Sequence, residues 1–74
     1  MAKSARFVVC LDNSGYEVSL ERRKIYLAVP DTKARKLGQL RVVDESGEDY
    51  LYPAEMFIEA ELPQSVRRAL LQAA

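Results

Sequence analysis

The stretch QLRVVDESGEDYLYPAEMFIEAEL, residues 39–62, alternates apolar and polar residues in three short runs. This period of two is typical of strands, because successive side chains of a strand point to opposite faces of a sheet. A turn around Gly47 separates the first two runs, and Pro53 ends the second because proline has no N–H for a β-ladder. Between the second and third runs we expect a single helical turn. The stretch therefore predicts strands at 39–44, 50–52 and 57–62.

Three further runs precede this stretch. The run at 7–11, FVVCL, is apolar on both faces, which is typical of a central strand that is covered on both sides. After a turn at 12–15, the run at 16–20 alternates, and we expect its apolar residues to point inward. A charged loop at 21–24 then leads into the run at 25–29. The upstream half therefore predicts three more strands, the last two joined as a hairpin.

The sequence also predicts two helices. Residues 30–38 combine Asp31 or Thr32 as an N-cap, basic residues near the end and Gly38 as a stop, which together predict a short connector helix. Residues 63–74 begin with proline and carry apolar residues at helical spacing, so they predict a C-terminal helix that lies on the sheet or plugs the end of a barrel. The residues of this apolar stripe are Val66, Ala69, Leu70 and Ala73.

A chain of 74 residues is long enough for one small domain and too short for two. Five to six short strands joined by short turns favour a closed or nearly closed barrel, because closure removes the exposed strand edges. We therefore predict a mainly β protein. It is a single domain at 1–74, a small β-barrel of five to six short strands with a short connector helix and a C-terminal helix at 63–74.

The twelve residues GEDYLYPAEMFI, from Gly47 to Ile58, resemble the C-terminal part of Src-homology-3 domains. In that family a glycine turn leads into a strand that ends in an aromatic residue and proline, followed by one helical turn and a last strand. The resemblance implies a Src-homology-3-like small barrel. It also makes Tyr52 and Phe57, on either side of Pro53, the aromatic ridges against which a polyproline helix would pack. The family's groove is walled by a Trp, and this chain contains none.

The composition excludes several kinds of site. The chain has no His and a single cysteine, Cys10, so zinc sites built from Cys and His are unattainable, as are Ser-His and Cys-His nucleophile pairs. We therefore expect a protein that is not an enzyme and that holds no metal or other cofactor. One unpaired thiol fits a reducing compartment, and the apolar run at 7–11 is too short for a signal peptide or a membrane span. These features predict a cytoplasmic protein that does not enter a membrane.

Charge is balanced overall but divided along the chain. Eleven Lys and Arg residues balance eleven Asp and Glu residues. Residues 1–41 hold nine basic and four acidic residues, a net charge of +5, and residues 42–74 hold two basic and seven acidic residues, a net charge of −5. The division indicates either a basic binding face or complementary elements that lie side by side in the fold. Overall neutrality argues against a protein that mainly coats nucleic acid.

The main candidate binding site is the basic loop Arg22-Arg23-Lys24, assisted by basic residues of the connector helix. Such residues would contact phosphates in a salt-dependent manner that ignores sequence, and the alternative is a solvated loop that pairs with nearby carboxylates. We expect the acidic run at 44–49 to be a solvated turn rather than a calcium loop, and Cys10 to be a buried, inert thiol. The assisting basic residues are Lys33, Arg35 and Lys36.

No motif in the chain identifies a function on its own. We expect a small non-catalytic protein-binding or adaptor module with an unidentified protein partner. One alternative is a weak nucleic-acid-binding barrel that uses Arg22, Arg23 and Lys24. Another is an accessory subunit of a larger assembly, and a core this small would gain stability from association in either the adaptor or the subunit.

Overall fold

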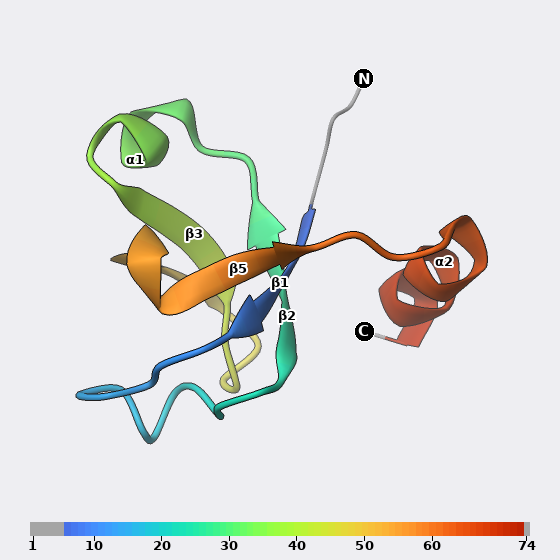
Figure 1. The fold of residues 1–74 in the computed structure, drawn as a ribbon, viewed down its shortest axis with the longest axis horizontal. Helices are drawn as coiled ribbons and strands as arrows, with labels where there is room; N and C mark the ends of the chain where they lie inside the picture. Colours follow the sequence, from blue (N-terminus) through green and yellow to red (C-terminus); the bar gives the residue numbers. More distant parts are fainter. Residues whose placement is uncertain (1–5, 74) are drawn as a thin grey trace.

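The computed structural model describes residues 6–73, which form a five-stranded antiparallel sheet and two α-helices (Figure 1). The strands lie side by side in the order β4-β3-β2-β1-β5. The predicted mainly β fold is therefore confirmed. The elements in chain order are β1 (Arg6–Cys10), β2 (Ile25–Val29), α1 (Thr32–Lys36), β3 (Gln39–Val43), β4 (Asp49–Pro53), the 3₁₀ turn η1 (Ala54–Met56), β5 (Phe57–Ala60) and α2 (Gln64–Ala73).

The sheet curls without closing. Within the described residues β4 and β5 are its two edges and do not pair with each other, so the predicted closed barrel is not confirmed. In a flat sheet these edges would stand about 19 Å apart, four strand spacings of roughly 4.8 Å. The chain passes from β4 to β5 through η1 alone, and four residues reach about 14 Å at most. The sheet must therefore curl until its edges approach each other at this corner.

The hydrophobic core lies on the inner face of the curled sheet. Val8 and Tyr26 lie opposite each other on β1 and β2, and Val42 of β3 lies opposite Ala28, so alternate residues of neighbouring strands meet on the same side. Val42 and the free thiol Cys10 are completely buried. The core residues are Val8, Cys10, Leu20, Tyr26, Ala28, Val42, Tyr52, Met56 and Phe57.

The predicted strand at 16–20 is wrong. Residues 11–24 form one long loop between β1 and β2, and within it the amides of Ser19 and Leu20 donate to the Tyr16 carbonyl at 3.0 and 2.9 Å, as in a turn of helix. Leu20 enters the core and Tyr16 packs edge-on against Tyr52, with ring centroids 5.0 Å apart. Val18, in contrast, is 94% exposed. Tyr16 and Leu20 are four residues apart, which places both side chains on the same side of a helical turn. The alternation of apolar and polar residues at 16–20 therefore does not reflect a strand.

The predicted connector helix is confirmed as α1. Its N-cap is Asp31, whose carboxylate accepts a hydrogen bond from the Ala34 amide at 3.0 Å. The helix ends before Gly38, whose φ of +73° lies in the left-handed region that favours glycine. The hairpin of β3 and β4 and the helical turn after Pro53 also form where the sequence predicts them.

The C-terminal helix forms, but it neither covers the sheet nor plugs it. Figure 1 shows α2 standing to one side of the sheet, beyond the end of β5. Its contact with the sheet includes Arg67, whose guanidinium carbon lies 5.3 Å from the centre of the Phe7 ring. Val66 of the predicted apolar stripe stays exposed, as does Leu71 outside the stripe. The loop and η1 supply Leu20 and Met56 to the core.

Candidate functional site

The basic loop predicted from sequence is exposed but partly neutralised. The Arg23 amide donates to the Cys10 carbonyl at 2.7 Å, and Arg23 itself has a φ of +68°. Lys24 forms an ion pair with Glu45 at 2.6 Å and lies 5.7 Å from the centre of the Tyr26 ring. Among residues 6–73 the structure gives Arg22 and Arg23 no ion pair. One of the three predicted cations therefore already has a carboxylate partner.

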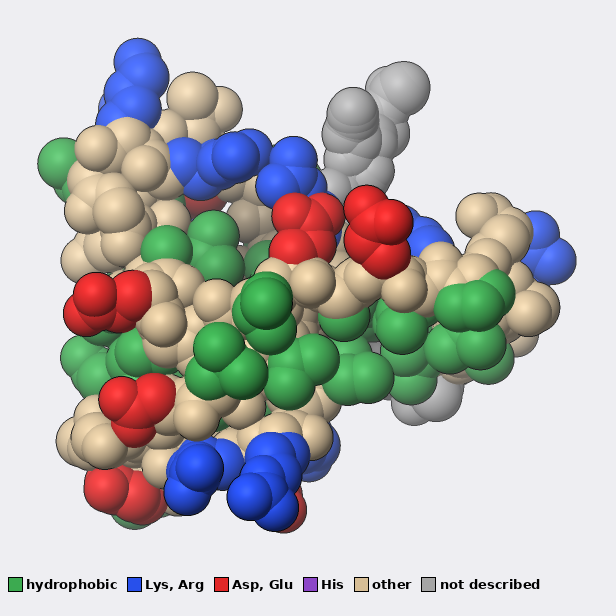
Figure 2. Space-filling view, in the orientation of Figure 1, with side chains coloured by type: hydrophobic (Ala, Val, Ile, Leu, Met, Phe, Trp, Pro, Cys, Tyr) green, Lys and Arg blue, Asp and Glu red, His purple; other side chains and the backbone are tan. Residues whose placement is uncertain are grey.

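The structure does not bring this loop together with the basic residues of α1. The loop precedes β2 and α1 follows it, so the two basic groups lie at opposite ends of one strand. Figure 2 shows Lys and Arg side chains in separate groups at opposite margins of the displayed face. Lys33, Arg35 and Lys36 are exposed on α1. A single phosphate backbone would need to cross the whole sheet to contact both groups.

The residues on which a proline-peptide groove would depend lie mainly in the core. Tyr52 and Phe57 are both buried, and their rings contact each other edge-to-face with centroids 6.2 Å apart. Pro53 is half-buried at the end of β4. The two rings thus form an interior wall of the curled sheet, and neither presents a ridge to solvent.

The acidic turn after β3 is organised by hydrogen bonds of its own. Asp44 is buried and accepts from the Ser46 amide at 2.9 Å, from the Ser46 hydroxyl at 2.5 Å and from the Tyr52 hydroxyl at 2.6 Å. Burial raises the pKa of Asp44, but these hydrogen bonds to the carboxylate outweigh burial and lower the pKa below its usual value. Within the described part of the chain, no group of three or more Cys, Asp or Glu residues is arranged to hold a metal ion.

Cys10 is completely buried in the core. Its thiol lies 3.5 Å from the Asp12 carbonyl, and burial raises its pKa above the usual value for a thiol. A raised pKa keeps the sulfur protonated at neutral pH, and only the thiolate is a good nucleophile. The Cys10 side chain is therefore placed to pack in the core rather than to react as a nucleophile.

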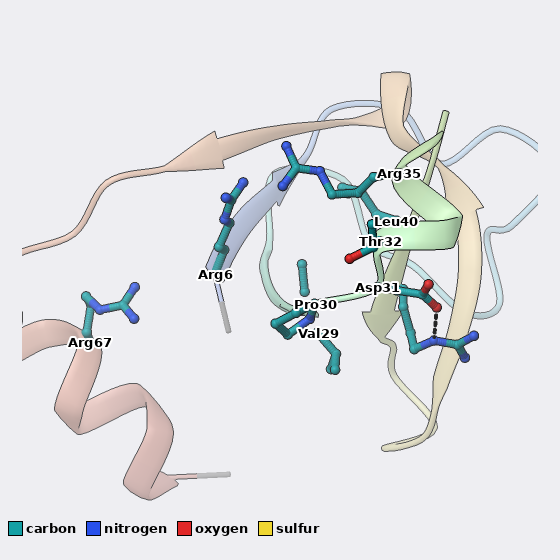
Figure 3. A pocket seen from close by; sticks show the side chains of 10 residues that line it. Arg6, Val29, Pro30, Asp31, Thr32, Arg35, Leu40 and Arg67 are labelled. Carbon is teal, nitrogen blue, oxygen red and sulfur yellow. Dashed lines mark hydrogen bonds and ion pairs between the residues drawn. The ribbon is translucent and has the colours of Figure 1, made fainter. Parts of the chain in front are cut away.

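A cavity lined by four arginines lies where the core opens to solvent, between the ends of β1, β2 and β3, helix α1 and helix α2. Its volume is about 440 Å³. Arg6 alternates with Val8 and Cys10, so its side chain leaves β1 on the inner side of the sheet. Figure 3 shows Arg6 of β1 and Arg35 of α1 extending toward each other, with Arg67 apart from them on α2. The lining residues are Arg6, Ala28, Val29, Pro30, Asp31, Thr32, Arg35, Leu40, Arg41 and Arg67.

The single carboxylate in this lining is already engaged. Asp31 caps α1 and also receives Arg41 Nε at 2.8 Å, the ion pair marked by the dashed line in Figure 3. The Ala34 amide and then the Arg41 guanidinium lower the pKa of Asp31, so it stays ionised. Arg41 in addition contacts Asp49 at 3.1 Å. Arg41 and Asp31 therefore offset each other.

The other arginines of the cavity differ in the groups that they contact. Arg6 lies 3.4 Å from Glu59, and both side chains are about half exposed. Arg35 has no ion pair with any residue at 6–73. Arg67 stacks over Phe7. Of these three, sequence reasoning singled out only Arg35, because Arg6 and Arg67 stand near the two ends of the chain without a local motif.

The outer face of the sheet carries a second candidate surface. On it Val9 of β1 lies directly between Ile25 of β2 and Ile58 of β5, and we call these three residues the docking row. Ile25 is 38% exposed and Ile58 is 55% exposed. Figure 2 shows a band of hydrophobic side chains that crosses the displayed face and continues onto α2. Exposed apolar side chains that adjoin one another in this way mark interaction surfaces.

Comparisons with known proteins identify no relative. No family model matches the chain, and no curated protein or solved structure matches it. No helix at 6–73 has the length and apolar character needed to cross a membrane. The function must therefore be inferred from the two surfaces just described.

Proposed function

We propose that this protein is a small non-catalytic protein-binding module, and that the docking row is its contact with a partner protein. The observation that carries the proposal is the register of the row. The row consists of Ile25, Val9 and Ile58, which adjoin one another on three strands that are neighbours in the sheet. Ile25 and Ile58 are exposed. The half-buried Leu27 and Val43 extend the same outer face toward β3.

The row offers a partner a useful amount of binding free energy. Fully burying an aliphatic side chain contributes about 1.5–3 kcal/mol, so completing the burial of a half-exposed isoleucine contributes about 1 kcal/mol. The sheet also provides a rigid base, because β1 is hydrogen-bonded to neighbours on both sides. A rigid apolar row loses little conformational entropy when a partner covers it.

Protein is the partner that this surface favours over nucleic acid. The exposed basic residues divide between the two ends of β2, and Lys24 is paired with Glu45. Binding of a phosphate backbone requires several cationic side chains that contact it at the same time, and an apolar row provides no such contacts. The nucleic-acid alternative therefore becomes an outcome of the test below. An accessory subunit would use the same row, with a partner that is permanent.

The finer assignment of the fold as Src-homology-3-like is part of this proposal. It is supported by the succession of a strand that ends in Pro53, the single turn η1 and the last strand β5, which agrees with the resemblance of Gly47–Ile58 to that family. A strongly curled sheet agrees with it as well. With Tyr52 and Phe57 buried, the binding mode proposed here differs from docking of a proline-rich peptide.

Affinity capture with matched variants tests the proposal. The baits are the natural chain, Ile58→Glu and Val18→Glu, each used on extract of the native cell with and without nuclease. Both variants place a glutamate on an exposed aliphatic position, but only Ile58 belongs to the row. We expect partner proteins that survive nuclease, persist with Val18→Glu and are lost with Ile58→Glu. Equal capture by all three baits would refute docking at the row, and capture that nuclease abolishes would favour the nucleic-acid alternative.

A further inference from the structure

The free edge of β4 is a surface that protein docking at the outer face leaves unused. β4 is the last strand on its side of the sheet, and within residues 6–73 no strand pairs with its free edge. We propose that this edge pairs with the same edge of a second copy of the chain, so that two β4 strands run antiparallel and join two sheets into one. This inference does not rest on the docking row, which lies on β2, β1 and β5.

The hydrogen bonds at the two ends of the β3–β4 hairpin show which backbone groups of β4 face the free edge. The Asp44 amide donates to the Glu48 carbonyl at 3.0 Å, and the Ala54 amide donates to the Gly38 carbonyl at 2.9 Å. In an antiparallel ladder, hydrogen-bonded pairs alternate with pairs that are not hydrogen-bonded. In this register the backbone groups at positions 48, 50, 52 and 54 therefore face β3, and those at 49, 51 and 53 face the free edge.

Two residues of β4 present both a donor and an acceptor at the free edge. Asp49 and Leu51 each direct an N–H and a C=O away from β3, whereas Pro53 has no N–H. Proline is tolerated at this position because an edge strand needs no donor on its free side. The part of the edge that can form a complete ladder is therefore short, and it ends before Pro53.

Two copies of the chain satisfy these groups in one register. When the strands run antiparallel about a two-fold axis at Tyr50, Asp49 of each copy lies opposite Leu51 of the other. Each of these two pairs exchanges two N–H···O=C hydrogen bonds. An axis at Leu51 would instead place Asp49 opposite Pro53, which has no N–H for the Asp49 carbonyl. The position of the proline therefore selects the axis at Tyr50.

The side chains at this edge favour the same pairing. Tyr50 is 50% exposed and Leu51 is 41% exposed, so each face of the strand carries a large apolar side chain that is only half covered. In the proposed register Tyr50 lies opposite its counterpart in a pair that is not hydrogen-bonded, where opposing side chains approach most closely. The Asp49 carboxylate is paired with Arg41 at 3.1 Å, which reduces the repulsion between the two copies.

The other edge of the sheet is better protected against pairing. Charged residues on an edge strand discourage contact with another strand. On β5 the backbone of Glu59 faces the free edge, because the Leu11 amide donates to the Met56 carbonyl and the ladder alternates from there. Glu61 follows two residues later. β4 has its charge and its proline at the two ends of the strand, and its centre is aromatic and aliphatic.

The small size of the contact determines how strong the dimer is. Four backbone hydrogen bonds and one aromatic pair on a five-residue strand bury less surface than a stable interface, which covers about 1,200–2,000 Å². We therefore expect a dimer that forms reversibly as the concentration of the chain rises.

Sedimentation equilibrium of the purified chain, from micromolar to millimolar concentration, tests the pairing. We expect the mass to rise from that of a monomer toward twice that value and no further, because a two-fold contact closes on itself. Amide hydrogen exchange followed by NMR locates the contact. The Asp49 and Leu51 amides should exchange more slowly at high concentration, whereas the Glu59 amide on the other free edge should not change.

Substitutions of Tyr50 test the register. Tyr50→Lys and Tyr50→Glu each place two like charges opposite each other at the two-fold axis and remove the aromatic pair, so each should weaken dimerisation about tenfold. An equimolar mixture of the two variants should recover the dimer, because a lysine then lies opposite a glutamate. Val18→Lys and Val18→Glu introduce the same charges at an exposed loop position and should leave dimerisation unchanged. Circular dichroism and thermal melting of dilute samples show that each variant is folded.

Four results would overturn the inference. The first is a natural chain that stays monomeric at millimolar concentration, and the second is a mass that grows beyond a dimer, which would indicate open-ended pairing of β4 with β5. The third is a dimer that Tyr50→Lys leaves intact and Ile58→Glu abolishes, which would place the contact on the docking row. The fourth is a monomeric chain whose partners in affinity capture are lost with Tyr50→Lys, which would assign the edge to a strand of another protein.

Discussion

The hydrogen bond between Tyr52 and Asp44 provides a sharp test of how this small core is stabilised. The Tyr52 hydroxyl donates to a buried carboxylate at 2.6 Å, that of Asp44, which also accepts from the Ser46 hydroxyl. Tyr52→Phe removes this donor and leaves the ring in place. A hydrogen bond to a charged group contributes about 1.5–3 kcal/mol, so we expect the variant to lose about 2 kcal/mol of unfolding free energy. A 74-residue domain has about 4–11 kcal/mol in total, so the loss is large.

The same strand offers a matched control for this substitution. Tyr50 also donates to a carboxylate, that of Glu48 at 2.8 Å, but this pair is exposed to water. Tyr50→Phe should therefore leave the urea midpoint unchanged within error, whereas Tyr52→Phe should lower it. If both variants lose the same stability, or if neither does, then burial does not give the Asp44 contact its strength and the reasoning fails.

The contribution of Asp44 should also depend on pH. Its pKa in the folded protein is lowered below the unfolded value, so its stabilisation is fully present above the unfolded pKa, about 3.9, and is lost as the pH falls through the folded pKa. The difference between the natural chain and Tyr52→Phe should therefore shrink below about pH 4. Urea unfolding at neutral pH and at successively lower pH measures this difference. A constant difference down to acid pH would contradict the assignment of the hydrogen bond to the ionised form.

Three further predictions follow from burial. Leu20→Ala should cost about 2–5 kcal/mol of unfolding free energy because the side chain is buried, whereas Val18→Ala should change urea unfolding little. Cys10 should resist a water-soluble thiol reagent until the chain unfolds, and rapid labelling of the native protein would contradict its burial. Leu70→Asp should reduce the free energy of unfolding by less than about 1 kcal/mol, and so lower the melting temperature only slightly, because α2 stands beside the sheet. A large drop in melting temperature would show that the helix packs on the sheet.

Local chemistry explains the parts of the fold that the sequence predicts correctly. Asp31 caps α1 and Gly38 ends it through contacts within a few residues, and Pro53 ends β4 because of its own missing N–H. Each of these depends on neighbours along the chain. The strands predicted from alternation at 25–29 and 39–43 are also confirmed, as β2 and β3. Each of them has a neighbouring strand on both sides.

The errors arise where a local pattern depends on a distant partner. The run at 16–20 alternates like a strand, but β1, the strand before it in the chain, already pairs with β2 and β5 and has no free side for another strand. The loop instead folds over the core and contributes Leu20. Closure of the barrel and the position of α2 are also tertiary outcomes. Both depend on how much of the apolar surface of the sheet is left uncovered by the other elements, and no short stretch of sequence determines that area.

The arginine cavity is beyond local reasoning for the same physical reason. Pairing of β1 with β5 places Phe7 opposite Ala60, so the chain leaves the last strand beside the first. Seven residues after Ala60, Arg67 reaches the Phe7 ring, next to Arg6. Only Arg35 belonged to a recognisable basic cluster, and in that cluster it is the residue that lines the cavity while Lys33 and Lys36 do not. Charge counted along the chain thus gives the right sign for this surface, but the grouping of its cations follows from the tertiary arrangement of strands and helices.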